Sequence, residues 1–267
     1  MRHMRLKLRD VLLLGLGLTG LQAQTMYVMN AGVIVGKFNE NAQVESMIFY
    51  KPSIDSSTTV TDIDGNVYNT ITIGKQQWMA ENLKTTRYAD GTAIPLVNNM
   101  TDWGALNATD KAYCWYNYNE ANKGTYGALY TWAAAINRAS SSTANPSNIQ
   151  GVCPIGWHLP CDAEWTTLTT YLGGESVASG KLKETSTTHW MSPNTAATNE
   201  TGFTALPGGN CGSYGTFDDV GFSGYWWCAT EYNSNYAWYQ SMQYSDSEVF
   251  KNAYVKEVGF SVRCVRN

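Results

Sequence analysis

Two stretches of sequence decide the fold: GVCPIGWHLPCDAEW at residues 151–165 and GFSVRCVRN at residues 259–267. The first leads into a helix predicted over residues 162–172, because its apolar side chains recur at helical spacing and Gly173-Gly174 follows them. The second belongs to a strand predicted over residues 258–265, in which Val258, Phe260, Val262 and Cys264 share one face and Ser261 and Arg263 the other.

Further elements flank these two stretches. Helical spacing of apolar side chains predicts a second amphipathic helix over residues 126–137. Short β-prone runs predict strands over residues 225–230 and 236–243, and a hairpin or strand pair over residues 67–73 after the Asp64-Gly65 turn. Helices in the middle of the chain with antiparallel strands around them predict an α+β fold with long Gly-rich loops.

The N-terminal residues predict export. Basic residues precede an apolar run at residues 11–21, which is typical of a secretory signal peptide over residues 1–23. The run is about half of the roughly 20 residues that span a bilayer, so no membrane insertion is expected after cleavage. We expect a short N-terminal β-hairpin element at residues 24–52, a linker at 53–59 and the main domain at 60–267.

Composition narrows the location and the partners of the chain. No cysteine stands at the expected cleavage site, so lipoprotein anchoring is not expected and a secreted or cell-surface location is. The formal net charge is −4, and removal of the basic leader makes it more negative. Nucleic acid is a poor partner for such a surface.

The six cysteines lie between Cys114 and Cys264. In an exported chain, six cysteines indicate disulfide bonds before free thiols, and they allow about fifteen complete pairings. Structural zinc is not expected, because the spacings contain no C-x-x-C and few histidines accompany them.

A set of phrases resembles a known family. They are TDIDGNVY at residues 61–68, IGKQQWMAENL at 73–83, YGALY at 126–130 and the two stretches quoted first. In this order they resemble the Fibrobacter succinogenes major paralogous domain (FISUMP). The resemblance implies an exported bacterial surface domain of undetermined biochemical role. It also implies a disulfide-stapled fold similar to C-type lectins and formylglycine-generating enzymes, with two helices beside a twisted antiparallel sheet.

The resemblance carries one disulfide pairing. Cys153 and Cys264 stand in the family's CPxGWH and SVRC phrases, which implies a bond between them, stabilising by about 4 kcal/mol in the chain-entropy estimate. Cys161 stands at a capping-box position, three residues before Glu164, where the family has Ser or Thr. For the remaining cysteines we predict the pairs Cys211 with Cys228 and Cys114 with Cys161.

The sequence contains no recognisable catalytic machinery. No G-x-S-x-G occurs, and His158, between Trp157 and Leu159, is more typical of a satisfied core residue than of a catalytic base. Asp218-Asp219 in a Gly-rich loop and the phrase Trp190 to Asn194 both invite comparison with calcium sites, but neither forms a full motif. No cofactor or metal is therefore predicted, and calcium has only this incomplete support.

Aromatic residues carry the functional hypothesis. Exposed Trp and Tyr beside Asn and Glu are suited to the apolar faces of sugars and to protein contacts. Two interpretations stay open, in which the aromatic residues mostly fill the core or partly form a binding surface. The candidate ligand-binding residues are Trp190, Asn194, Tyr225, Trp226, Trp227, Glu231, Tyr232 and Trp238.

Three classes of function follow. The first is an exported surface module that binds glycan or protein through aromatic loop surfaces. The second is a structural or adhesive component of the envelope or of fimbriae. The third is an oxidative enzyme of the formylglycine-generating type, for which Cys211 and Cys228 are the only candidate redox pair, and fold analogy alone does not license it. We expect no enzymatic activity.

Overall fold

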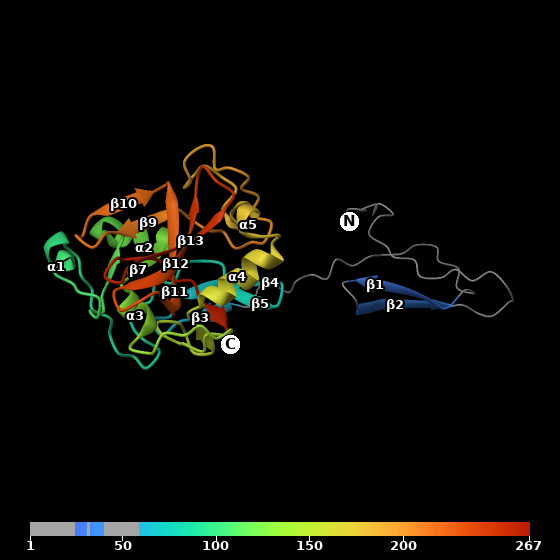
Figure 1. The fold of residues 1–267 in the computed structure, drawn as a ribbon, viewed down its shortest axis with the longest axis horizontal. Coiled ribbons are helices and arrows are strands. Elements are labelled where there is room, and N and C mark those ends of the chain that lie inside the picture. The colour runs from blue at the N-terminus through green and yellow to red at the C-terminus, as the bar shows by residue number, and fades with distance from the viewer. Residues whose placement is uncertain (1–24, 31–32, 40–58) are drawn as a thin grey trace. The chain divides into compact units, whose positions relative to one another are not determined.

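The computed structural model describes residues 25–30, 33–39 and 59–267, with side chains from residue 59 onward. The chain divides into two units, residues 1–52 and residues 53–267. In the first unit, β1 (Thr25–Asn30) and β2 (Val33–Asn39) pair as antiparallel strands, within the range where a β-hairpin element was expected (Figure 1). The predicted signal peptide and residues 40–58 lie outside the described residues. No helix within the described ranges is long and apolar enough to cross a membrane.

The larger sheet of the second unit is built from the C-terminal third of the chain (Figure 1). Its order is β10-β9-β11-β12-β13, and all neighbours are antiparallel except β9 and β11, which run parallel. The strands are β9 (Gly208–Cys211), β10 (Phe217–Val220), β11 (Ser223–Glu231), β12 (Tyr236–Gln243) and β13 (Val249–Val255). The strands predicted over residues 225–230 and 236–243 are confirmed.

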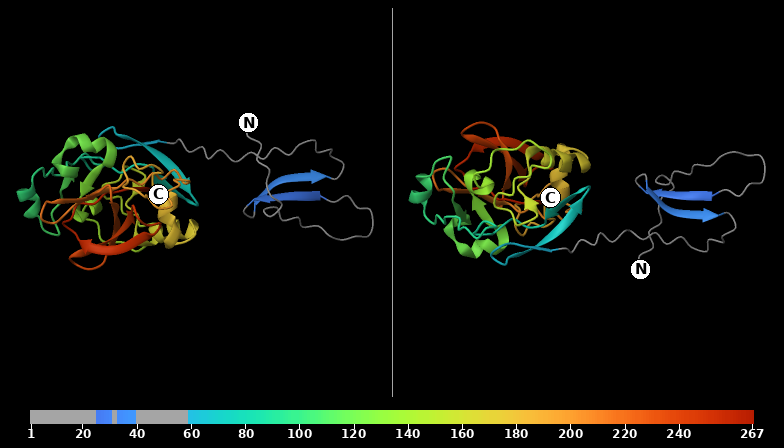
Figure 2. Two further views of the ribbon diagram at one scale, coloured as in Figure 1. Left: turned by 90° about the horizontal axis from the view of Figure 1, so that it is seen from above. Right: turned by 90° about the horizontal axis from the view of Figure 1, so that it is seen from below.

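The second sheet joins the two stretches that decide the fold. Its order is β3-β4-β5-β14-β8, with β3 (Thr59–Thr61), β4 (Val67–Ile73), β5 (Gln76–Met79), β8 (Trp157–His158) and β14 (Val265–Arg266). Val265 pairs with both Trp78 and His158, so the last strand lies between the strand from residues 73–83 and the strand from residues 151–165. The right-hand view of Figure 2 shows the C-terminus beside the segment that leads to α4.

Residues 67–73 form one strand where a hairpin or strand pair was predicted. The Asp64-Gly65 turn connects β3 to β4, and β4 then pairs with β5. Asp62 holds this turn, because its Oδ1 accepts hydrogen bonds from the backbone N–H groups of Asp64 and Asn66 at 2.9 Å each. Both edges of β4 are therefore used within the sheet.

Five short α-helices occur within residues 59–267. They are α1 (Met100–Gly104), α2 (Lys123–Tyr126), α3 (Trp132–Ile136), α4 (Asp162–Tyr171) and α5 (Glu175–Leu182). The helix predicted over residues 162–172 is confirmed by α4. Its N-terminus is closed by Glu164, whose Oε2 accepts from the Cys161 N–H at 2.9 Å. Together with the two sheets, these helices confirm the α+β class.

The helix predicted over residues 126–137 is wrong in its first half. Gly127, at φ +75°, ends α2, and β7 (Ala128–Tyr130) then pairs with β6 (Tyr113–Trp115). An extended strand and a helix of five residues, α3, replace the single helix. Apolar spacing alone could not distinguish them, because all three residues of β7 are buried.

The strand predicted over residues 258–265 is also wrong over most of its length. Only β14 is a regular strand, while Gly259, Phe260 and Ser261 bridge to Cys211, Tyr130 and Trp226 in turn. Both faces of this segment are buried, including Arg263, which is 1% exposed. Its guanidinium donates to Asn82 Oδ1 and to the carbonyls of Phe203 and Thr204, and burial lowers the pKa of Arg263 to about 9.

Aromatic side chains dominate the core. Trp78, Trp165, Phe203 and Trp226 form one cluster with ring centroids 4.8 to 6.3 Å apart. Each such ring stabilises the fold by about 1.5–3 kcal/mol through burial, with edge-to-face contacts adding to this. A smaller satellite cluster contains Trp103, Ala112, Cys114, Leu129 and Cys211.

The disulfide implied by the resemblance is confirmed: Cys153 bonds to Cys264. The other two predicted pairs are wrong, because Cys114, Cys161, Cys211 and Cys228 are free and buried. The Cys161 thiol forms a hydrogen bond instead of a disulfide, because its Sγ donates to the carbonyl of Ala144 at 2.9 Å. The disulfide indicates an extracytoplasmic location.

Candidate functional site

The hairpin between β11 and β12 presents aromatic side chains to solvent. We call residues 231–238 the hairpin tip. Asn233 shapes it, because its Oδ1 accepts from the N–H groups of Asn235 and Tyr236 at 2.9 Å each. Tyr232 is 58% exposed and meets the half-buried Trp238 edge-on, with ring centroids 5.0 Å apart. The tip is therefore a rigid turn that carries a partly accessible aromatic pair.

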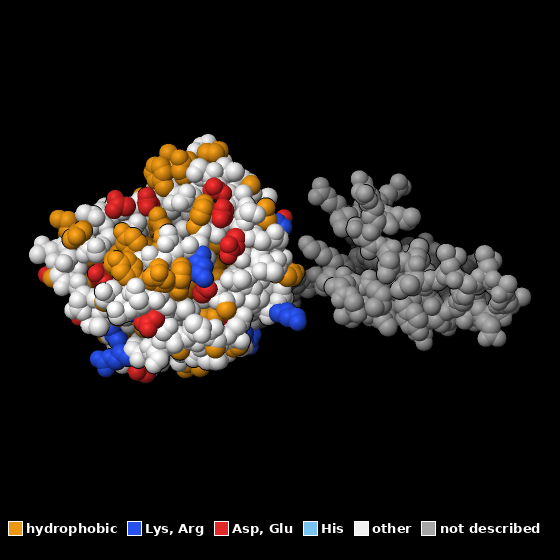
Figure 3. Space-filling view, in the orientation of Figure 1, with side chains coloured by type: hydrophobic (Ala, Val, Ile, Leu, Met, Phe, Trp, Pro, Cys, Tyr) orange, Lys and Arg blue, Asp and Glu red, His pale blue; other side chains and the backbone are white. Residues whose placement is uncertain are grey.

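A cation completes the outer side of this aromatic pair. Lys251 Nζ lies 4.4 Å from the centroid of the Trp238 ring and 2.6 Å from Asp162 Oδ2. The ion pair at the start of α4 thus fixes the lysine over the indole. In the view of Figure 3, hydrophobic side chains gather over β11, β12 and β13, with acidic side chains around them.

A hollow of about 250 Å³ adjoins the hairpin tip. Its lining includes three basic side chains, Lys111, Arg138 and Lys256, together with Trp132 from α3 and Ser234 from the tip. We call it the basic hollow. Its volume lies just below the roughly 300–1,000 Å³ of pockets for drug-sized ligands, so it has room for one small group such as a single sugar residue.

The Lys256 side chain, which lines the basic hollow, is held in place by several contacts. Its Nζ lies 4.4 Å from the Trp132 ring centroid and donates to Glu231 Oε2 at 2.8 Å and to the Ser234 carbonyl at 2.9 Å. Glu231 and Ser234 therefore lock the lysine to the hairpin tip. These two acceptors take two of the three N–H donors of the ammonium group, which also lies over the Trp132 ring.

Arg138 and Lys111 also line the hollow. Lys111 Nζ donates to Asn137 Oδ1 at 2.6 Å, and burial together with the nearby Arg138 lowers the pKa of Lys111. Arg138 is exposed and has no ion-pair partner among residues 59–267. Asn137 and Arg138 both adopt left-handed backbone, at φ 51° and 63°. Such conformations cost energy for an arginine and cluster at functional sites.

A second aromatic group lies on the sheet itself. Tyr225, Trp227, Tyr239 and Tyr254 surround Phe260, and Tyr225 stacks on it with centroids 5.0 Å apart. Tyr254, on the edge strand β13, is 49% exposed. The Tyr225 hydroxyl donates to Asp219 Oδ2 at 2.5 Å. Asp219 thus orients an aromatic ring from strand β10, where the sequence had suggested a Gly-rich loop with incomplete support for calcium.

Four of the predicted ligand-binding residues belong to the core. Trp226 and Trp227 are fully buried, and Trp190 and Asn194 are nearly so. The three indole N–H groups donate to Asn82, Tyr130 and Ala205, and the Asn194 amide donates to the carbonyls of Glu184 and Ser186. For these residues a surface role is wrong, because their side chains are buried and their N–H groups donate within the fold, while Asn194 Oδ1 is buried without a hydrogen-bond partner.

The other four lie at or near the surface. Glu231, Tyr232 and Trp238 come together at the hairpin tip, while Tyr225 belongs to the sheet group. Sequence reasoning missed Lys111, Arg138 and Lys256. These three come from separate segments, and no local motif marks them.

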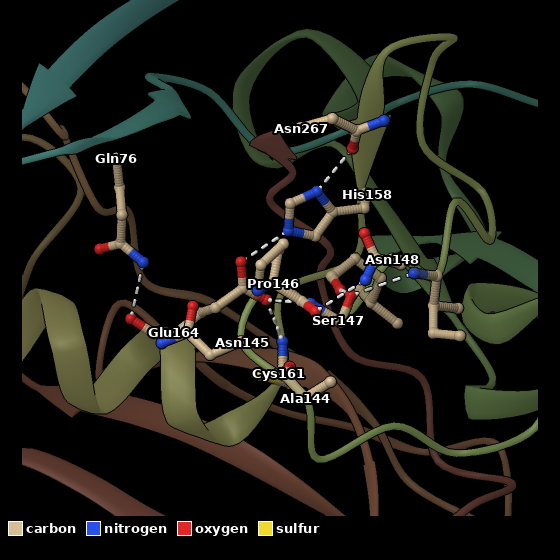
Figure 4. Close-up of polar contacts among 12 residues, drawn as sticks. Gln76, Ala144, Asn145, Pro146, Ser147, Asn148, His158, Cys161, Glu164 and Asn267 are labelled. Carbon is tan, nitrogen blue, oxygen red and sulfur yellow. Dashed lines mark hydrogen bonds and ion pairs between the residues drawn. The ribbon is translucent and has the colours of Figure 1, made fainter.

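His158 lies in a closed polar network (Figure 4). Its Nε2 lies 2.6 Å from Glu164 Oε1 and its Nδ1 lies 2.7 Å from Asn267 Oδ1. Burial opposes the charged ring, but the hydrogen bond and charge of Glu164 outweigh it and raise the pKa of His158. Burial likewise opposes the Glu164 carboxylate, but His158 and backbone donors lower the pKa of Glu164. Both side chains are at most 3% exposed, so the pair serves the scaffold.

No group of three or more His, Cys, Asp or Glu side chains that could hold a metal ion occurs in the described part of the chain. The carboxylates of the Asp-rich turn have other partners. Asp62 Oδ2 accepts from the Tyr68 hydroxyl at 2.5 Å, and Asp64 pairs with Arg87 at 2.6 Å. These acids therefore organise the turn before β4.

One comparison with known proteins identifies the family. The family model described as the Fibrobacter succinogenes major domain matches residues 71–266. The match covers most of the chain and confirms the resemblance seen in the quoted phrases. No curated protein and no solved structure matched the chain.

Proposed function

The chain belongs to the Fibrobacter succinogenes major domain family, and from that premise we propose that it is an exported surface module that binds an acidic glycan. The hairpin tip and the basic hollow together form the proposed site. The observation that carries the proposal is that Lys111, Arg138 and Lys256 line one hollow, which Ser234 of the hairpin tip also lines. Aromatic rings accept the apolar face of a sugar, and the cations accept its carboxylate.

The three cations have unequal roles in this proposal. Lys256 is already paired with Glu231, so it positions the rim of the hollow. Arg138 is unpaired within residues 59–267 and contributes a planar fork that matches a carboxylate. Lys111 lines the same hollow and adds positive potential there. A neutral sugar has no negative charge to pair with these cations.

We propose that the fold is of the C-type lectin kind. The family resemblance implies this fold, which is also similar to that of formylglycine-generating enzymes. Support comes from α4 and α5 lying beside an antiparallel sheet (Figure 1) and from β3 and β14 occurring in one sheet. We further propose that the domain is not an oxidative enzyme. Cys211 and Cys228 are fully buried, and burial raises the pKa of the Cys228 thiol, which disfavours the reactive thiolate.

Binding of the full chain to oligosaccharides by titration calorimetry tests the proposal. We expect an oligosaccharide ending in a hexuronic acid to bind at least about tenfold more tightly than its neutral hexose counterpart, with affinity falling as salt rises. Arg138→Ala and Lys111→Gln should each weaken the acidic ligand about tenfold. Lys181→Ala is the matched control, because Lys181 forms an exposed ion pair with Glu200. Equal affinity for acidic and neutral sugars, or none for either, would refute it.

An adhesive envelope component is the second candidate. The half-exposed Tyr254 on the edge strand β13 favours it, because edge strands and aromatic surface are suited to protein contacts. Chemical cross-linking of the exported chain in intact envelopes tests this alternative. A stable partner that is lost on Tyr254→Ser would support it, whereas a freely secreted monomer would contradict it.

A further inference from the structure

Cys114 and Cys211 lie together in the satellite cluster of the core. Cys114 belongs to β6 and Cys211 ends β9, and both side chains are fully buried. With Trp103, Ala112 and Leu129 they form the whole buried part of this cluster. Two segments far apart in the sequence thus bring two thiols into one small apolar space.

The backbone explains how the two cysteines meet. Cys114 is the cross-strand partner of Leu129 in the β6–β7 ladder. Cys211 exchanges two hydrogen bonds with Gly259, at 3.0 and 2.8 Å. A side chain at Gly259 would stand 3.1 Å from Cys211 Cβ and 3.2 Å from Leu129 Cβ. The glycine therefore leaves the gap across which Cys211 approaches Leu129 and its neighbour Cys114.

Cys114 and Cys211 are neighbours within this buried cluster. Burial raises the pKa of the Cys114 thiol, and a hydrogen bond with Cys211 and the charge that Cys211 would carry raise it further. The other contacts of Cys211 Sγ are long, at 4.0 Å to the Tyr118 hydroxyl and 3.9 Å to the Gly212 carbonyl. Each cysteine is therefore the other's nearest sulfur partner in the satellite cluster.

The remaining two thiols differ from this pair. Cys161 Sγ donates to the Ala144 carbonyl at 2.9 Å, and Cys228 Sγ accepts from Gln240 Nε2 at 3.8 Å. They also belong to different parts of the core, since Cys161 packs in one cluster and Cys228 in another. These two cysteines have the environment of structural thiols.

We propose that Cys114 and Cys211 form a second disulfide in the exported protein. The oxidant is a protein disulfide of an extracytoplasmic thiol oxidoreductase, the same class that must form Cys153–Cys264. One cysteine thiolate attacks the oxidant's disulfide, and the second cysteine then displaces the oxidant's thiol from the mixed disulfide. The new S–S bond takes the place of the oxidant's S–S bond, and two electrons and two protons leave with the oxidant as two thiols. The exchange takes place while the satellite cluster is still open, because burial in the folded unit disfavours the thiolate.

Thiol counting on the full chain tests the proposal. The chain is refolded with reduced and oxidised glutathione until Cys153–Cys264 is linked, and is then alkylated in denaturant without reductant. We expect two alkylated cysteines, Cys161 and Cys228, where the four free thiols of the structure would give four. Digestion with trypsin and with a protease that cleaves before aspartate separates Cys211 from Cys228 at Asp218. Mass spectrometry should then find residues 112–123 linked to the peptide that contains Cys211.

Cysteine variants distinguish the proposed disulfide from the other possible pairings. Cys161→Ser/Cys228→Ser should leave no alkylated cysteine, and Cys114→Ser should expose Cys211 to the reagent. Alkylation of both Cys114 and Cys211 in a chain that carries the Cys153–Cys264 bond would overturn the proposal. A Cys211–Cys228 or Cys114–Cys161 crosslink would overturn it equally.

Discussion

The His158–Glu164 network and the basic hollow both contain charged side chains. In the network the charged groups are paired inside the protein, whereas in the hollow one cation is exposed and unpaired. Glu164 accepts hydrogen bonds from His158 and from the N–H groups of Ser147 and Cys161, so the protein itself supplies the partners of its carboxylate. In the hollow, Arg138 is exposed, and no acid among residues 59–267 pairs with it.

This difference separates scaffold from candidate site. A buried charge persists only when the protein supplies all of its partners, so a closed network stabilises one structure. Arg138 is an exposed cation on left-handed backbone without an ion pair in residues 59–267, so its charge is not expected to stabilise the fold. The comparison therefore predicts large effects on stability in the first region, and effects on binding with little change in stability in the second.

The largest expected effect is that of Glu164→Ala. The substitution leaves the His158 ring and two backbone N–H groups without their acceptor in a buried site. We expect a loss of about 3–5 kcal/mol in the free energy of unfolding, measured by urea denaturation. Glu200→Ala is the control, since its exposed pair with Lys181 is worth less than about 1 kcal/mol. Equal losses in the two variants would contradict the distinction.

The same network predicts a pH window. Glu164 has a pKa lowered from its ordinary value of 4.5, so its contribution is complete above pH 4.5 and is lost as the pH falls through the lowered pKa. His158 has a pKa raised from 6.5, so its contribution is complete below pH 6.5 and is lost as the pH rises through the raised pKa. The stability difference between the wild type and His158→Gln should therefore be largest between pH 4.5 and 6.5. A difference that is flat from pH 3 to 9 would show that the pair is not ionised.

Local signals in the sequence predicted part of the fold. The helix α4 combines periodic apolar residues with Glu164 and a following Gly pair, and strands β11 and β12 are continuous β-prone runs between turns. Such elements carry their own start and stop signals. The Cys153–Cys264 bond was implied by the family phrases. Local propensity could not have predicted this bond.

Long-range packing decided the rest. Residues 128–130 form a strand because β6 lies ready to pair with them, and Arg263 is buried because Asn82, far along the chain, supplies its acceptor. Of the predicted ligand-binding residues, Trp226 and Trp227 alternate on a strand whose two faces are both covered. The basic hollow draws on several loops and a hairpin, so only the folded chain reveals it.

The smallest expected change in stability comes from Arg138→Gly, and it isolates the functional side of the comparison. At φ 63° a glycine removes the steric cost of a Cβ, which offsets the entropy that it adds to the unfolded chain. We expect the free energy of unfolding to stay unchanged or to rise by up to about 1 kcal/mol, while the affinity for the acidic sugar falls as in Arg138→Ala. Alanine keeps the left-handed strain, so Arg138→Ala should be the less stable of the two variants. A glycine variant that keeps its affinity would remove Arg138 from the site, because stability and binding would then both be indifferent to the guanidinium.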